Sequence, residues 1–270
     1  MLRHSRQWLQ RGAKGLYFPI NHRNIDMRVD PTANEEVDIQ SRYRRHLRTD
    51  FITGETRQTE VPEWSRRTPP THFISLPLPV KNVLTSRVQQ MREAMIFTNK
   101  NVESVLIPTA KLHVTLAVLT VPSGAETEKV PLIADIIKDA SEKICKEPLK
   151  LRFRGLGTFS NGRVLFARCV AEEHFTTLDQ LVRRVRRDIG QQLNVDVKGN
   201  PHDSYIPHIT VAKIRPSQKE AFGSRLPLSM WADFQHQDFG DVTFDEIQLC
   251  NMKGKGKNDY YKVESSVKIQ

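Results

Sequence analysis

Two segments of the chain share a pattern in which apolar residues alternate with a histidine and a threonine. The first is Lys111-Leu112-His113-Val114-Thr115-Leu116, and the second is Pro207-His208-Ile209-Thr210-Val211. Side chains alternate between the two faces of a strand, so the histidine and threonine of each segment share one face. The residue between them points into an apolar layer. The sequence therefore predicts two buried strands, each presenting an imidazole beside a hydroxyl.

The periodicity around the first motif predicts a strand–helix–strand unit. A strand covers His72–Val80, and its prolines indicate an edge position. The next apolar residues recur at helical spacing: Leu84, Val88, Met91 and Met95. A motif strand over Leu112–Leu119 completes the unit.

A second unit of the same order surrounds the second motif. It begins with a strand over Val164–Val170 and continues with a helix over Glu172–Leu193 before the motif strand. The apolar stripe of this helix is Phe175, Leu178, Val182, Val185 and Ile189. Four arginines are expected outside the stripe: Arg183, Arg184, Arg186 and Arg187. The repeated order predicts two lobes related by a pseudo-twofold, with the two His-Thr pairs facing each other across a central groove. The predicted fold is α+β and bilobal, with antiparallel sheets lining the groove and helices outside.

The other periodic segments complete this fold. A helix is expected near Pro131 and ends before Pro148, with one apolar face: Ile133, Ile136, Ala140 and Ile144. A strand over Leu149–Phe153 precedes a glycine-rich segment, Gly155–Gly162. After a polar loop, Phe244–Met252 and Tyr260–Ile269 are predicted to form a hairpin.

The first 70 residues lack a sustained period and are predicted to be a basic extension, with the folded domain over residues 71–270. Met1–Ile25 carries several arginines and no acidic residue, which is typical of a mitochondrial transit peptide. A basic tail without structure is the alternative. We expect a cytoplasmic or nuclear location, with a mitochondrial one as the alternative, and no contribution of residues 1–70 to catalysis.

The net charge, the cysteines and the hydrophobic runs limit the classes of protein and of partner that fit this sequence. The net charge of +10 over 270 residues suits an anionic partner such as a nucleotide, RNA or acidic lipid, although a soluble basic protein can carry it too. Cys145, Cys169 and Cys250 are far apart and lack metal-ligand spacing, which indicates a reducing compartment. No run of residues is long and apolar enough to span a bilayer.

The paired motifs point to acid–base chemistry at phosphorus. Of two imidazoles across a groove, one can take a proton from an attacking hydroxyl while the other donates one to the leaving oxygen. Thr115 and Thr210, together with Lys213, can hold the non-bridging oxygens of a phosphodiester. No carboxylate cluster accompanies the histidines, so we expect neither a metal centre nor a cofactor. Serine-hydrolase elbows and Walker loops are not found in the sequence.

Each candidate residue also has a structural interpretation. A single His-x-Thr in a strand is usually structural, but two copies in matching strand–helix units favour the catalytic role of His113 and His208. Phe159 and Tyr205 could stack on a base, with core packing or loop anchoring as the alternative. Lys213 could be a solvated residue at a strand end.

The chain resembles the two-histidine phosphoesterases, and it is most similar to the A-kinase anchor protein 7-like phosphoesterase domain. The resemblance covers residues from about Pro70 to Gln270. It rests on the paired motifs and on several further segments, namely Thr71–Pro77, Gly155–Phe159, Tyr205–Thr210, Ile247–Cys250 and Asp259–Ser266. It implies the bilobal fold, metal-independent phosphodiester chemistry and binding of an AMP-type nucleotide in the groove.

Two functional hypotheses follow. The first is a phosphodiesterase (a hydrolase) that acts on 2′-5′ oligoadenylate or 2′,3′-cyclic phosphate ends of RNA-type substrates. The second is a non-catalytic nucleotide-binding module used in signalling or scaffolding. We expect a nucleotide or short oligonucleotide as partner, a monomer, and no helix that binds a kinase regulatory subunit, because the chain stops right after its last strand.

Overall fold

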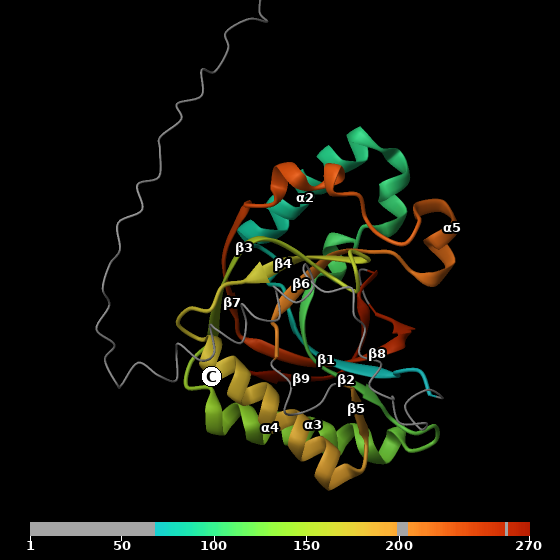
Figure 1. The fold of residues 1–270 in the computed structure, drawn as a ribbon. Helices are drawn as coiled ribbons and strands as arrows, with labels where there is room; N and C mark the ends of the chain where they lie inside the picture. Colours follow the sequence, from blue (N-terminus) through green and yellow to red (C-terminus); the bar gives the residue numbers. More distant parts are fainter. Residues whose placement is uncertain (1–67, 199–204, 257–258) are drawn as a thin grey trace, which may run out of the picture.

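The computed structural model describes residues 68–198, 205–256 and 259–270. The hypotheses for the basic extension and for its transit peptide concern residues 1–67, which lie outside these ranges. The strands within the described residues form one nine-stranded sheet in the order β7-β3-β4-β6-β2-β1-β8-β9, with β5 paired to β2 (Figure 1). The strands are β1 His72–Pro77, β2 His113–Thr120, β3 Leu149–Phe159, β4 Val164–Cys169, β5 Asp196–Lys198, β6 His208–Lys213, β7 Asp238–Phe244, β8 Glu246–Lys255 and β9 Tyr261–Lys268.

The strand order is symmetric about the boundary between β6 and β2. On one side lie β6, β4, β3 and β7, and on the other lie β2, β1, β8 and β9. Every pairing is antiparallel, and the contact between β2 and β6 centres on one residue pair, Val114 with Ile209. These are the residues between the histidine and threonine of each motif. The predicted bilobal α+β fold is confirmed, with both lobes belonging to one continuous sheet. The predicted edge position of β1 is wrong, because β1 pairs with β2 on one side and with β8 on the other.

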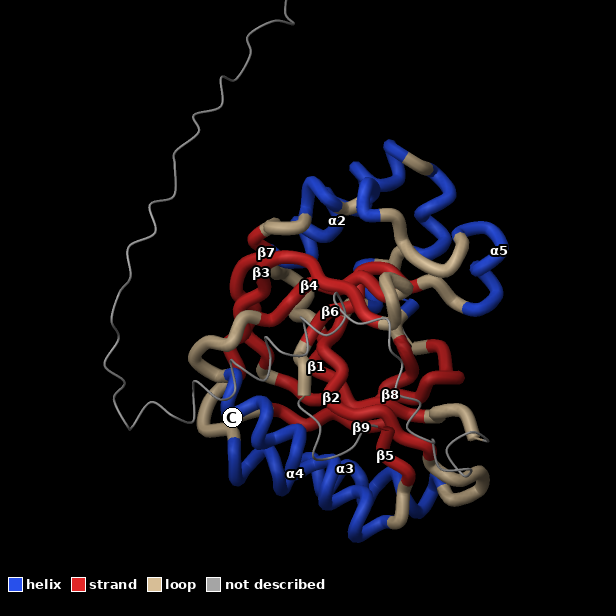
Figure 2. The backbone as a smooth tube through the Cα atoms, viewed as in Figure 1, coloured by secondary structure: helices blue, strands red, loops and turns tan. Residues whose placement is uncertain are grey.

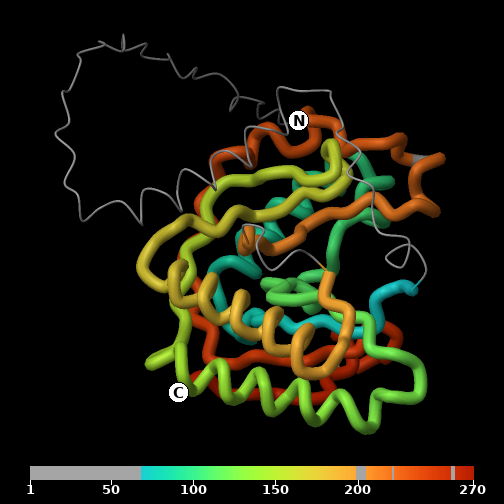
Figure 3. Tube along the Cα trace, turned by 60° about the horizontal axis from the view of Figure 1, so that its bottom comes forward, coloured from blue at the N-terminus to red at the C-terminus, as the bar shows by residue number. Residues whose placement is uncertain are grey.

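Three long helices cover the outside of the two lobes: α2 Val83–Thr98, α3 Glu126–Ile144 and α4 Phe175–Leu193. Helix α2 packs against β7, where Arg87 donates a 2.6 Å hydrogen bond to the carbonyl of Asp238. Helices α3 and α4 pack together against the opposite lobe, on β9, β2 and β5 (Figure 2). Seen from below, α3 and α4 lie side by side across that lobe (Figure 3). Helix α2, which follows β1, and helix α4, which follows β4, thus each pack against the other lobe. These contacts hold the two lobes together.

The buried faces of the helices follow the predicted stripes in two of three cases. Helix α2 buries the four predicted apolar residues, and α4 buries all five of its predicted stripe. Helix α3 is rotated from the prediction, since Ile137 and Ser141 are buried where Ile136 and Ile144 were expected. Its sequence offers isoleucines on adjacent positions, and packing against both α4 and β9 decides which of them is buried.

Two predicted loops are strands in the structure. Strand β3 continues through the glycine-rich segment to Phe159, and Asp238–Phe244 forms β7, which pairs with β3. The polar character of β7 concealed it, because it is an edge strand whose exposed residues, Asp241 and Thr243, are polar.

The burial of α2 predicts that two of its apolar residues contribute very differently to the free energy of unfolding. Met91 is 1% exposed, whereas Phe97 is 94% exposed. We expect Met91→Ala to lower the free energy of unfolding by about 2 to 5 kcal/mol, because it leaves a cavity between helix and sheet. Phe97→Ala serves as the control and should change it by less than about 0.5 kcal/mol. Equilibrium denaturation measures both, and equal losses would show that α2 does not pack as described.

Candidate active site

The two motif histidines are held by the same hydrogen bond. Nδ1 of His113 lies 2.8 Å from the carbonyl of Lys111, and Nδ1 of His208 lies 2.8 Å from the carbonyl of Ile206. A carbonyl only accepts, so Nδ1 carries the proton in both rings. In the neutral imidazoles Nε2 is therefore left as an acceptor. The carbonyl two residues before each histidine thus selects the tautomer that leaves Nε2 able to receive a proton.

Aromatic rings enclose His113. Phe73 of β1 stacks on it with ring centroids 4.9 Å apart, and Tyr261 of β9 meets it edge-on at 5.9 Å. Tyr260 lies farther away, at 6.4 Å. These rings exclude water from one side of the imidazole and restrict its rotation.

A different set of rings encloses His208. Phe159 and Phe166 stack on each other at 4.1 Å, and both meet the edge of His208, at 4.9 and 5.2 Å. Gly157 makes this packing possible, because a Cβ at that position would lie 2.7 Å from the Phe166 ring. Phe159, predicted as a candidate for base stacking, therefore already has a ring stacked on one of its faces.

Desolvation by these walls shifts the titration of both histidines. It lowers the pKa of His113 to about 4, although the hydrogen bond to Lys111 opposes the shift and the charge of His208 adds to it. Desolvation likewise lowers the pKa of His208, against its hydrogen bond to Ile206. His113 is therefore neutral at pH 7, and burial favours the neutral form of His208 as well.

Each motif strand carries a β-bulge one residue after its threonine. Along β1, Ile74 pairs with Ala117, but the next residue, Ser75, pairs with Thr115, so Leu116 is the extra residue of β2. A bulge of this kind bends the strand and changes which side chains face a given side.

The second lobe repeats the bulge at the equivalent position. Along β4, Leu165 pairs with Ala212 and the next residue, Phe166, pairs with Thr210, which makes Val211 the extra residue of β6. The pseudo-twofold therefore extends from the order of the elements to the irregularities of the strands.

The bulges decide which residue follows the threonine on the groove side. Strict alternation would place Ala117 and Ala212 beside the threonines. Instead both alanines are buried, and Val118 and Lys213 face a common cavity. Lys213, predicted to contact the substrate, thus lies on the groove face because of the bulge.

The cavity between the lobes has a volume of about 400 Å³, within the range of small-molecule sites. It holds three of the four motif residues, while His208 is not part of its wall. The lining residues are Phe73, Ile107, Lys111, His113, Thr115, Val118, Thr210, Lys213, Arg215, Met252 and Tyr261. Of the predicted substrate-binding residues, Lys213 lines the cavity, whereas Phe159 and Tyr205 do not.

The side chains of Tyr205 and Arg186 donate hydrogen bonds to backbone carbonyls of the first motif strand. The buried hydroxyl of Tyr205 donates a 2.8 Å hydrogen bond to the carbonyl of Thr115. Nε of Arg186 donates to the carbonyl of the bulged Leu116 at 2.9 Å, and its guanidinium lies 5.1 Å from the centre of the Tyr205 ring. In β6, the bulged Val211 instead accepts from a backbone amide, that of Ile107, at 2.9 Å.

Arg186 lies outside the apolar stripe of α4, as the sequence predicted, and its head group reaches the sheet. A long arginine side chain can cover apolar surface and still place its charged end on a carbonyl. Tyr205 also directly precedes the residue that orients His208, so one segment contacts both motifs.

The sequence-based site omitted several residues that the structure brings to the cavity. Lys111 and Arg215 flank the motif strands, and Phe73 and Tyr261 come from β1 and β9. The only signal for the two aromatic residues was their place in the segments Thr71–Pro77 and Asp259–Ser266, which carry the resemblance.

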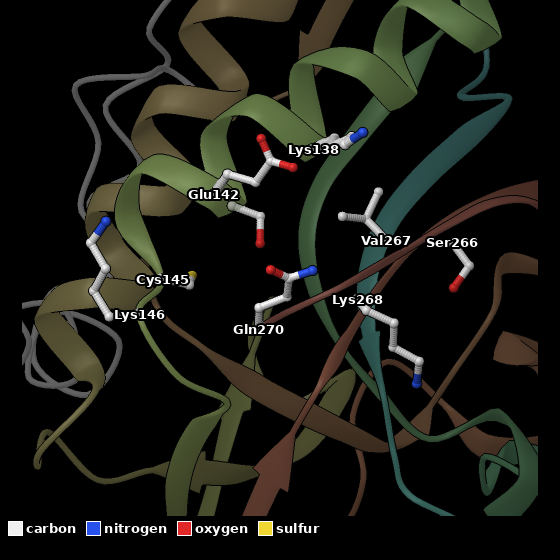
Figure 4. Close-up of a pocket in the computed structure, with 9 residues that line it drawn as sticks. Lys138, Glu142, Cys145, Lys146, Ser266, Val267, Lys268 and Gln270 are labelled. Carbon is white, nitrogen blue, oxygen red and sulfur yellow. The ribbon is translucent and has the colours of Figure 1, made fainter.

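A second hollow, of about 560 Å³, lies between α3 and the end of β9 (Figure 4). Its wall combines lysines with Glu142 and contains none of the motif residues. Within residues 68–198, 205–256 and 259–270, no group of three or more His, Cys, Asp or Glu residues is placed to hold a metal ion. No helix of the described part is long and apolar enough to cross a membrane.

The Tyr205 contact predicts a defect that combines stability and activity. We expect Tyr205→Phe to lower the free energy of unfolding by about 1 to 3 kcal/mol, because the buried Thr115 carbonyl loses its donor. Turnover should fall as well, since that carbonyl belongs to the first motif. Ser104→Ala, which removes an exposed hydroxyl-to-carbonyl hydrogen bond of 3.0 Å, is the control and should do neither. Unchanged turnover in Tyr205→Phe would contradict a supporting role.

Solved structures with distant similarity align over nearly their whole length with about three quarters of this chain. A crystal structure of a phosphoesterase is 17% identical and covers 75% of this chain and 99% of its own, with a TM-score of 0.48. The protein TT0787 of Thermus thermophilus is 20% identical (74% and 97% covered, TM-score 0.46). E. coli LigT complexed with 3′-AMP is 16% identical (75% and 99% covered, TM-score 0.45).

The comparison with family models assigns the chain to a family. A comparison with curated proteins gives no match. The family model described as the AKAP7 2′5′ RNA ligase-like domain matches residues 70–269, which include both motifs, both bulges and the cavity. The chain belongs to this family of two-histidine phosphoesterases.

Proposed function

We propose that the protein is a metal-independent phosphodiesterase in which His113 and His208 act as general base and general acid. The observation that carries this proposal is the matched environment of the two imidazoles. Each donates Nδ1–H to the carbonyl two residues before it, and each is followed by a threonine and a bulge. Such duplication is not needed for packing, but it suits a reaction with two proton transfers.

The proposed reaction uses one histidine at each end of the phosphorus centre. Nε2 of the base removes a proton from the attacking water or ribose hydroxyl while that oxygen bonds to phosphorus. The other histidine, protonated at Nε2, gives its proton to the leaving oxygen as the second P–O bond breaks. One proton is taken up and one is released, so the two histidines exchange protonation states during turnover.

The threonine hydroxyls and Lys213 are proposed to hold the non-bridging oxygens. Thr115 and Thr210 line the same cavity, and Lys213 adds a positive charge to it. Negative charge grows on these oxygens in the transition state, so donors already in place stabilise that state more than the ground state.

The substrate proposed is an RNA-type phosphodiester, either a 2′-5′ oligoadenylate or a 2′,3′-cyclic phosphate end. The family description, with its 2′5′ RNA ligase-like domain, favours the 2′-5′ linkage. The alternative function is a nucleotide-binding module without turnover. Incubation with 2′-5′ and 3′-5′ oligoadenylates separates the two, because binding without cleavage of any linkage would support the module.

Removal of either imidazole tests the assignment. We expect His113→Ala and His208→Ala each to reduce turnover by a factor of about 10² to 10⁴, with far-ultraviolet circular dichroism unchanged. The assays contain excess chelator, which the parent protein should tolerate because the proposed chemistry uses no metal. His236→Ala, at an exposed position, should cleave like the parent. Full activity in both active-site variants would contradict the proposal.

The lowered pKa values predict where the pH optimum lies. The profile of kcat/KM reports the free enzyme, in which both imidazoles titrate below 6.5. The bell-shaped dependence of kcat/KM on pH should therefore have its maximum below pH 6.5. On the acid side kcat/KM falls because the general base becomes protonated. A bound phosphodiester anion favours the protonated imidazoles, so the kcat profile should be displaced to higher pH. A kcat/KM maximum above pH 8 would contradict this account.

A further inference from the structure

The groove is symmetric at its centre and asymmetric at its ends. Two positions before the histidine, the first lobe has Lys111 and the second has Ile206. Five positions after it, the first lobe has Val118 and the second has Lys213. The pseudo-twofold thus relates each lysine to an apolar residue.

The antiparallel arrangement brings both lysines to the same end of the groove. With Val114 opposite Ile209, residues before His113 run alongside residues after Thr210. The segment leading into the first motif does follow the end of β6, since Leu106 bridges to Ala212. Lys111 and Lys213 line one cavity as a result.

A third cation joins them at this end. Arg215 lines the same cavity, and Tyr261 lies close to both Lys111 and Arg215. Nζ of Lys111 is 5.5 Å from the centre of the Tyr261 ring. Burial raises the pKa of the Tyr261 hydroxyl, and the charge of Arg215 opposes that shift.

These cations have no acidic counterpart in the cavity wall. None of its lining residues is Asp or Glu. Among the ion pairs of residues 68–198, 205–256 and 259–270, none involves Lys111, Lys213 or Arg215. Many other basic side chains of the fold, such as Arg152 and Arg184, are paired with carboxylates.

One phosphodiester does not account for this concentration of charge. It carries a single negative charge, which the threonines and Lys213 can meet. We propose that Lys111 and Arg215 form a subsite for a second phosphate group of the substrate, beside the scissile one. The inference rests on the proposed function of the same cavity. A phosphomonoester carries a charge of about −1.5 to −2, so together with a phosphodiester it would balance the three cations.

The second phosphate has two sources, which matched substrates distinguish. The first pair is the 2′-5′-linked adenosine dinucleotide with and without a 5′-terminal phosphate. The second pair is the unphosphorylated dinucleotide and the unphosphorylated trinucleotide, which adds an internal phosphodiester. We expect kcat/KM to rise about tenfold with the added phosphate in at least one pair. The pair in which it rises identifies the source.

Charge-removing variants tie this preference to the subsite. In Lys111→Gln and Arg215→Gln the gain, taken as the ratio of kcat/KM with and without the added phosphate, should fall toward unity. Lys219→Gln removes the same charge from an exposed position outside the cavity and should keep the full gain. The gain should also shrink at high salt, because partly exposed charges are screened. Equal kcat/KM within both substrate pairs, or an undiminished gain in both variants, would overturn the proposal.

A binding measurement separates this inference from the proposed catalysis. Dissociation constants for 5′-AMP and adenosine 3′,5′-bisphosphate are determined by calorimetry for the parent and the three variants. Tighter binding of the bisphosphate that is lost in Lys111→Gln and Arg215→Gln supports the subsite even if no oligonucleotide is cleaved. Equal affinity of the parent for the two nucleotides would reject the subsite and leave the phosphodiesterase proposal standing.

Discussion

The architecture depends on one antiparallel contact, between Val114 of β2 and Ile209 of β6. Both residues are fully buried, and they lie between the histidine and threonine of their motifs. Because side chains alternate along a strand, burying these two residues turns both His-Thr pairs toward the other side of the sheet. The same contact joins the lobes and aligns the motifs, so an error in register would disrupt the core and the site together.

The two lobes differ in the groups that donate hydrogen bonds to the carbonyls of their motif strands, although the motifs match. In the second lobe, a backbone amide binds the carbonyl of the bulged Val211. In the first lobe, Arg186 and Tyr205 bind the carbonyls of Leu116 and Thr115. Helix α4, which follows β4 of the second lobe, supplies Arg186 to the first, so the first lobe depends on the second for its support.

The asymmetry continues in the cavity and gives the site a direction. Its wall contains the imidazole of His113 and the hydroxyls of Thr115 and Thr210, while Lys111, Lys213 and Arg215 make one end strongly positive. A symmetric catalytic centre can act on a phosphodiester in either orientation. In the proposed function, the charges at one end favour the substrate orientation that places a second phosphate there.

The sequence by itself determined the alternation in each motif strand, the strand–helix–strand repeat and the buried stripes of α2 and α4. Those features depend on local periodicity, which a single chain displays directly. Only the tertiary structure decided the bulges. The bulge in β6 depends on the pairing with β4, and it places Lys213 on the groove face in the position that strict alternation would give to Ala212. The tertiary structure also decided the placement of Arg186 on a sheet carbonyl and of Tyr261 beside Lys111. These contacts join residues far apart in the chain, so their free energy comes from neighbours that no local pattern specifies.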